Sequence, residues 1–226
     1  IITFLNDSES MNIIFALVVV GDMVQYGGEK SANFKDSIAP KIVEYLVSPD
    51  ASVRQAAAFV LGTCAEYAPT TYHSICIPSL ETLSQVVNIP DAISDENRTA
   101  TENASSASAK ILFSYNTNIP NFDSHINGWL KTLPTLEDEE ASSFNYKFLS
   151  HLIEGNYPAV CSADAIPTVV DHVVQALFHN SLKDKAAAEA VNSVKKLLST
   201  MNHSEAMALL QNYPAPYMET IKTWFS

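Results

Sequence analysis

Two pairs of side chains in the sequence have the types and the spacing of reactive groups. His73 and Cys76 lie three residues apart, so on a helix they share a face, as a thiol and its activating base would. His172 and His179, seven apart, also share a helical face, as ligands of a zinc ion can. Neither pair has a third group that would orient or complete it. We therefore interpret Cys76 as a core residue and the two histidines as solvent-facing, and we expect no catalytic residue, no metal site and no cofactor.

Carboxylates are concentrated at two places. Glu137, Asp138, Glu139 and Glu140 crowd the start of an expected helix, where negative charge interacts favourably with the helix dipole. The same four residues are candidates for a patch that binds a basic protein. The acidic loop 91–96 has the same two interpretations, with a weaker signal.

The overall charge restricts the classes of partner. The chain carries 25 acidic and 13 basic residues, a net charge of −12. Nucleic acids and anionic membranes attract Lys and Arg, so we expect neither direct nucleic-acid binding nor membrane insertion. The longest apolar run, Ile13–Gly21, is also too short to span a bilayer. An acidic protein attracts basic partners. The simpler explanation of the negative charge is that it serves solubility alone.

Apolar residues recur with helical spacing along almost the whole chain, with Pro, Gly and Asn between the periodic segments. No segment has a convincing strand pattern. The chain has three cysteines, an odd number, and no C-x-x-C pair. Both features argue against a disulfide scaffold and a structural zinc site. The pattern predicts eleven helices, at about 8–26, 33–47, 50–68, 70–87, 98–115, 121–133, 137–154, 161–179, 183–200, 204–212 and 216–224.

The helices alternate in type, which predicts a repeat of two helices. First helices carry alanines where neighbouring helices would touch, and three second helices share a proline in their first half: Pro40, Pro78 and Pro167. Asn127 occupies the equivalent place in a fourth. A spacing of about 40 to 47 residues is the HEAT or armadillo period. The predicted fold is therefore all-α, a right-handed α-α superhelix of about five HEAT repeats, at 8–48, 50–88, 97–133, 137–179 and 183–226.

Stacked repeats bury their apolar faces against neighbours. The first pair must therefore expose the face formed by Ile13, Phe15, Leu17 and Val20, or bury it against preceding sequence. Trp224 and Phe225 are typical of a terminal cap.

One known family contains segments similar to five in this chain: Val53–Gly62, Ala100–Ala104, Trp129–Pro134, Phe144–Tyr146 and Leu152–Pro158. The segments occur in the family's order over about 50–160, while 161–226 resembles it only in helical layout. The chain is similar to the karyopherin-β nuclear transport receptors, closest to the importin-5 class and to its fungal branch. Members are about four to five times longer, so the resemblance implies a C-terminal portion.

The resemblance implies a nuclear import receptor rather than an enzyme. Such receptors bind cargo carrying a nuclear localisation signal, pass the pore on Phe-Gly nucleoporins, release cargo to Ran-GTP, and shuttle between cytoplasm and nucleus. A HEAT scaffold of a phosphatase or translation-factor complex is the alternative. Second helices usually line the inner surface of such an array. Trp129 on such a helix would either pack against a partner at that surface or fill the core. The candidate binding residues on second helices are Glu81, Asp123, Trp129, Asp164 and Asp171, besides Glu137, Asp138, Glu139 and Glu140.

Overall fold

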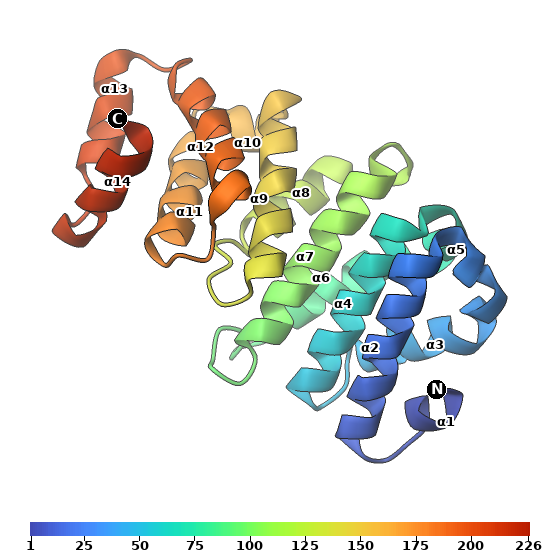
Figure 1. Cartoon of the computed structure of the whole chain (residues 1–226). Helices are drawn as coiled ribbons and strands as arrows, with labels where there is room; N and C mark the ends of the chain where they lie inside the picture. Colours follow the sequence, from blue (N-terminus) through green and yellow to red (C-terminus); the bar gives the residue numbers. More distant parts are fainter. The chain divides into compact units, whose positions relative to one another are not determined.

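The computed structural model describes residues 1–226, except for the side chain of Thr117, and divides them into two compact units, 1–132 and 133–226 (Figure 1). Every regular element in the described chain is a helix, as the sequence predicts. In the first unit the helices are α1 (Ile2–Leu5), α2 (Ser10–Gly27), α3 (Lys35–Tyr45), α4 (Ala51–Tyr67), α5 (Pro69–Cys76), α6 (Ser79–Val87), α7 (Arg98–Tyr115) and α8 (Phe122–Leu130). The second unit contains α9 (Glu139–Glu154), α10 (Pro158–Cys161), α11 (Ile166–Phe178), α12 (Asp184–Leu198), α13 (His203–Gln211) and α14 (Met218–Phe225). Short 3-10 turns span Gly28–Phe34, Asn116–Asn118 and Ala215–Tyr217.

Helix ends follow the capping residues in the sequence. The Asp50 carboxylate accepts hydrogen bonds from the backbone N–H groups of Ser52 (2.8 Å) and Val53 (3.3 Å), so α4 begins where a capping aspartate predicts. Asp138 does the same for α9 through the Ala141 N–H, at 2.9 Å. Gly28 ends α2 with φ of +54°, a conformation that favours glycine.

The three recurring prolines do not share one environment, although the sequence predicts each of them in the first half of a second helix. Pro40 lies inside α3 as expected. Pro78, however, separates α5 from α6, and Pro167 lies in the first turn of α11. A proline in the first turn lacks only an N–H that has no partner within the helix, so starting a helix there avoids the cost of an interior proline. The predicted helix 70–87 is therefore divided into α5 and α6, and the predicted helix 161–179 begins only at Ile166.

Helices α2, α4 and α7 form one packed layer, in which each contacts the next (Figure 1). Small residues allow these close contacts, as the sequence predicts: Ala16, Ala57 and Ala104 are fully buried. Helices α4 and α7 approach closely at Gly62, where an added Cβ would lie 3.2 Å from the Cα of Ala107. The α4–α7 contact is therefore made by backbone against backbone.

The apolar face expected on the first helix is divided between core and surface. Ile13, Leu17 and Val20 are buried, whereas the side chain of Phe15 is 55% exposed. Residues four and seven positions apart share a helical face, so Ile13, Leu17 and Val20 point together into the core. Phe15 lies on another face of the helix. The segment Ser10–Tyr45 is long and apolar enough to cross a membrane by length and composition alone, a test that core helices of soluble proteins also pass.

Hydrogen bonds connect points that lie about one repeat apart in the sequence. In the first unit, the Tyr115 hydroxyl donates to the Pro69 carbonyl over 46 residues, at 2.8 Å. In the second unit, the Ser181 hydroxyl donates to the Thr135 carbonyl over 46 residues, at 2.7 Å. Separations of 40 to 46 residues fit a stack of helix pairs in which each pair binds its neighbour. Four further pairs of this kind are Tyr45 with Leu5, Glu29 with Thr70, Arg54 with Asn97 and Gln175 with Tyr217. The exact repeat boundaries stay a prediction.

Candidate protein-binding site

The first unit contains a groove of about 380 Å³ between α6 and α8, with α7 beneath it. We call it the α6–α8 groove. Its volume is within the range of ligand-binding pockets, near the lower end. It is lined by Leu80, Glu81, Ser84, Val87, Ser108, Leu112, Ser124, His125, Asn127, Gly128, Trp129, Lys131 and Thr132.

The buried lining residues of the groove are apolar. Leu80 and Leu112 are 4% and 0% exposed, and Trp129 is 3% exposed. Trp129 therefore belongs to the core beneath the groove. Of the two roles that the sequence left open for it, contact with a partner and filling of the core, the structure supports the second. These three side chains are covered by their neighbours, so a ligand in the groove would meet the exposed polar residues of its lining.

The rim of the groove is polar and carries charge of both signs. Glu81 on α6 and Lys131 after α8 are exposed, and neither takes part in an ion pair among the residues described. Asp123, also exposed, immediately precedes the lining residue Ser124. Three of the predicted site residues, Glu81, Asp123 and Trp129, are thus at or beside one groove.

The other two acidic residues predicted on second helices belong to the second unit. Asp164 lies in the turn between α10 and α11, so its prediction as a helical residue is wrong. Asp171 on α11 is half-buried and interacts with the hydroxyl of Tyr213. Burial, together with the Asp171 carboxylate, raises the pKa of the Tyr213 hydroxyl. Asp171 therefore already has a structural partner.

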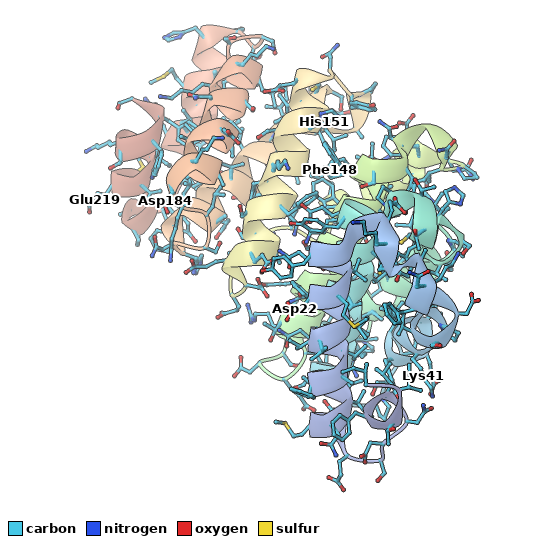
Figure 2. All side chains as sticks on the ribbon, turned by 45° about the vertical axis from the view of Figure 1, so that its right-hand side comes forward. Asp22, Lys41, Phe148, His151, Asp184 and Glu219 are labelled. Carbon is cyan, nitrogen blue, oxygen red and sulfur yellow. The ribbon has the colours of Figure 1, made fainter. Side chains whose placement is uncertain are left out.

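The run of four carboxylates before and within α9 is also partly structural. Asp138 caps the helix, and Glu139 forms an ion pair with Lys183. Glu139 and Glu140 lie in the first turn, where negative charge suits the helix dipole. Acidic side chains of both units lie at the surface elsewhere, among them Asp22, Asp184 and Glu219 (Figure 2).

The residue pairs with the spacing of reactive groups are not arranged for chemistry. The Cys76 side chain is fully buried, and burial raises the pKa of its thiol to about 12, while His73 is exposed with its ring against Tyr115. His179 is exposed as predicted, but His172 is only 8% exposed, so the prediction that it faces solvent is wrong. Among the described residues, no group of three His, Cys, Asp or Glu side chains is placed to hold a metal ion.

A second cavity, of about 390 Å³, is lined by both ends of the acidic loop, Asp91 and Glu96, and by Arg54. The Arg54 guanidinium donates to the carbonyls of Ser48 (2.6 Å) and Pro49 (3.0 Å) and to the side chain of Asn97. These bonds join the loop before α4 to the loop before α7. Arg54 is therefore a structural residue, and we assign no ligand to this cavity.

Comparison with known proteins gives three concordant results. Residues 138–191 match the family model described as an importin repeat. The chain is 53% identical over 224 residues to importin subunit beta-3 of Saccharomyces cerevisiae, covering 99% of this chain and 21% of that protein. It is 26% identical over 175 residues to a probable importin-5 homolog of Dictyostelium discoideum, covering 74% of this chain and 16% of that protein. The chain belongs to the karyopherin-β family of importins.

Solved structures of this family confirm the predicted helical-repeat fold. The karyopherin Kap121p bound to the SUMO protease Ulp1p is similar with a TM-score of 0.89 and 49% identity, over 99% of this chain and 20% of that one. Kap121p bound to RanGTP is similar with a TM-score of 0.86 and 48% identity, over the same shares. This karyopherin chain thus spans about a fifth of the length of the relatives it matches.

The sequence predicted Glu81 of the α6–α8 groove and its neighbour Asp123, but not Lys131 or the small lining residues. Ser84, Ser108 and Ser124 line it, and so does Gly128, which we had not singled out. Small polar residues on the outer faces of neighbouring helices are a signal in principle, since large side chains there would fill the space. That signal becomes visible only when the pairing of α6 with α8 is known.

Proposed function

We propose that this karyopherin chain is part of a nuclear import receptor, which binds cargo proteins carrying nuclear localisation signals and moves them through the pore under Ran-GTP control. The observation that supports it most is the 53% identity to importin subunit beta-3, which extends over 99% of the chain. Such a receptor acts by binding rather than by catalysis and shuttles between cytoplasm and nucleus. The buried, high-pKa thiol of Cys76 is in keeping with a protein that does no thiol chemistry.

The partners proposed for the whole receptor follow from its relatives. Kap121p has been crystallised bound to RanGTP, to Ste12p and to Nup53p. By similarity, we propose Ran-GTP, cargo proteins with basic signals and Phe-Gly nucleoporins as partners of the receptor to which this chain belongs. The exposed acidic residues Glu81 and Asp123 support basic partners for this portion.

A chimeric receptor tests the proposal. The portion of yeast importin subunit beta-3 that aligns with this chain is replaced by residues 1–226, and nuclear import of a fluorescent cargo is measured in permeabilised cells. We expect import, and release of cargo on addition of Ran-GTP. A chimera that is folded by circular dichroism and gel filtration but neither imports cargo nor responds to Ran-GTP would contradict the proposal.

A pull-down distinguishes an import receptor from a HEAT scaffold of a phosphatase or translation-factor complex. The folded chimera is presented with Ran-GTP, a Phe-Gly repeat fragment and a lysine-rich signal peptide, each immobilised separately. An import receptor binds all three, whereas a scaffold of another system binds none of them above the level of an unrelated helical-repeat protein.

A further inference from the structure

The segment 203–226, which contains α13 and α14, has much less buried core than the helices before it. Helices α11 and α12 bury eight and seven residues, whereas α13 buries none. Within 203–226, all of which the structure describes, Ile221 is the single buried residue. Trp224 and Phe225 in α14 are only half-buried. Hydrophobic burial therefore contributes little to holding this segment in place.

A row of polar and aromatic contacts attaches the segment to α11. Asp171, Gln175 and Phe178 are four and seven positions apart, so they share one face of that helix. The Tyr213 hydroxyl donates to the Asp171 carboxylate, and the Tyr217 hydroxyl donates to Oε1 of Gln175 at 3.0 Å. The ring of Tyr217 lies against that of Phe178, with 4.1 Å between their centroids. Such hydrogen bonds add only modest net stability, because the released groups bond to water instead.

Helices as short as α13 and α14 depend on what they pack against. They contain nine and eight residues, and isolated helices shorter than about 12–15 residues are marginal in water. Helix α14 contacts both α11 and α12 (Figure 1). Residues 199–202, which join α12 to α13, are not helical and are largely exposed. Loss of the contacts with α11 and α12 is therefore expected to unfold both short helices together.

We propose that residues 203–226 form a separate cooperative unit, which opens from α11 and α12 while the helices before it stay folded. Tyr213, Tyr217 and Ile221 set how often it opens. Each opening exposes the face of α11 that carries Asp171, Gln175 and Phe178. This conformational device does not depend on the proposed import function.

Native-state hydrogen exchange of the chain 1–226, followed by NMR or by mass spectrometry, tests the proposal. The amides inside α13 and α14 are expected to share one protection factor, which is about 100-fold or more below that of the amides inside α12. Protection in α13 and α14 equal to that in α12 would overturn the proposal. So would clearly different protection in α13 and α14, since the two helices would then open separately.

Tyr217→Phe tests the contact with α11, because it removes the bond to Gln175 and keeps the ring beside Phe178. Exchange in both α13 and α14 should become about 3- to 10-fold faster, with α12 unchanged. Tyr26→Phe is the control, since the side chain of Tyr26 is 83% exposed and belongs to the first unit. An equal acceleration in α12, or none in α13 and α14, would show that the bond does not hold a separate unit.

Ile221→Ala tests whether the two helices open as one. It removes the buried side chain of α14, and exchange should become at least about tenfold faster in α13 as well, although the sequence of α13 is unaltered. Met207→Ala is the matched control within the segment, because the side chain of Met207 is 42% exposed on α13, and little change is expected. Acceleration confined to α14 in Ile221→Ala would refute the cooperative unit.

Discussion

Replacement of Gly62 by alanine tests the close α4–α7 contact, because two opposing effects differ in size there. Alanine is favoured over glycine in a helix interior by about 1 kcal/mol. At Gly62, however, the new Cβ would lie 3.0 Å from Cδ of Lys110 and 3.2 Å from Cα of Ala107. Cα is backbone and shifts only with its helix, and Lys110 is itself held by an ion pair with Glu66 at 3.0 Å. Overpacking of this kind costs about 1–3 kcal/mol, so we expect a net loss of about 1 kcal/mol.

Gly128→Ala is the matched control for Gly62→Ala, since Gly128 is also inside a helix but has open space around it. There the helix preference acts alone, and we expect a gain of about 0.5–1 kcal/mol. The difference between the two variants, about 2 kcal/mol, is measured from urea unfolding curves followed by circular dichroism. If Gly62→Ala proves as stable as Gly128→Ala, the helices are not in contact at Gly62.

Two further substitutions and one thiol-labelling experiment test the packing, a helix cap and the cysteines. Ala57→Leu places a large side chain at a fully buried position and should lower the free energy of unfolding by about 1–3 kcal/mol; an unaltered melting temperature would show that Ala57 is not at a helix contact. Glu29 accepts hydrogen bonds from the backbone N–H groups of Thr70 and Thr71 at the start of α5 and from the Thr71 hydroxyl. Burial raises the pKa of the Glu29 carboxyl, but the hydrogen bonds together outweigh it, so the pKa lies below its ordinary value. The stabilisation is therefore present above the unfolded pKa of about 4.5 and is lost as pH falls through the lower folded value, so Glu29→Gln should cost about 0.5–1 kcal/mol at pH 7 and little at pH 3 in urea unfolding. Cys64 and Cys76 are fully buried with raised pKa values, so native protein should react with Ellman's reagent first at the half-buried Cys161, and two rapidly reacting thiols would contradict this burial.

The sequence was informative about the fold because helical repeats are built from local signals. The helix Arg98–Tyr115 has the predicted bounds, and Asp50 caps α4 as expected. These features depend on residues within one or two turns of each other. The roles of Pro78 and Pro167 were less predictable, since a proline is compatible with a bend inside a helix or with the start of a new one. Packing against neighbouring helices decides between the two, and that packing is not local.

The candidate site was predictable in its charges and not in its shape. Glu81 and Asp123 could be placed on second helices from the sequence alone. The groove beside them exists because Gly128 and Ser84 leave space that larger residues would fill, and because Trp129 turns inward beneath it. An indole on an amphipathic helix has the same spacing pattern whether it packs inward or meets a partner, so periodicity does not separate the two.

The bonds between successive helix pairs explain how such a chain holds a binding groove in place. Each pair has too little core of its own, so the geometry of α6 and α8 depends on α7 and on the preceding pair. Tyr115, at the end of α7, donates to the carbonyl of Pro69 at the start of α5, and Arg54 joins the loop before α4 to Asn97. These bonds fix both ends of α7 to the preceding repeat, and α7 forms the base of the groove. A change at the buried Gly62 contact is therefore expected to reach the groove through α7: in Gly62→Ala the backbone amides of Ser84 and Ser124 should shift in ¹⁵N NMR spectra, although no residue of the groove itself is altered.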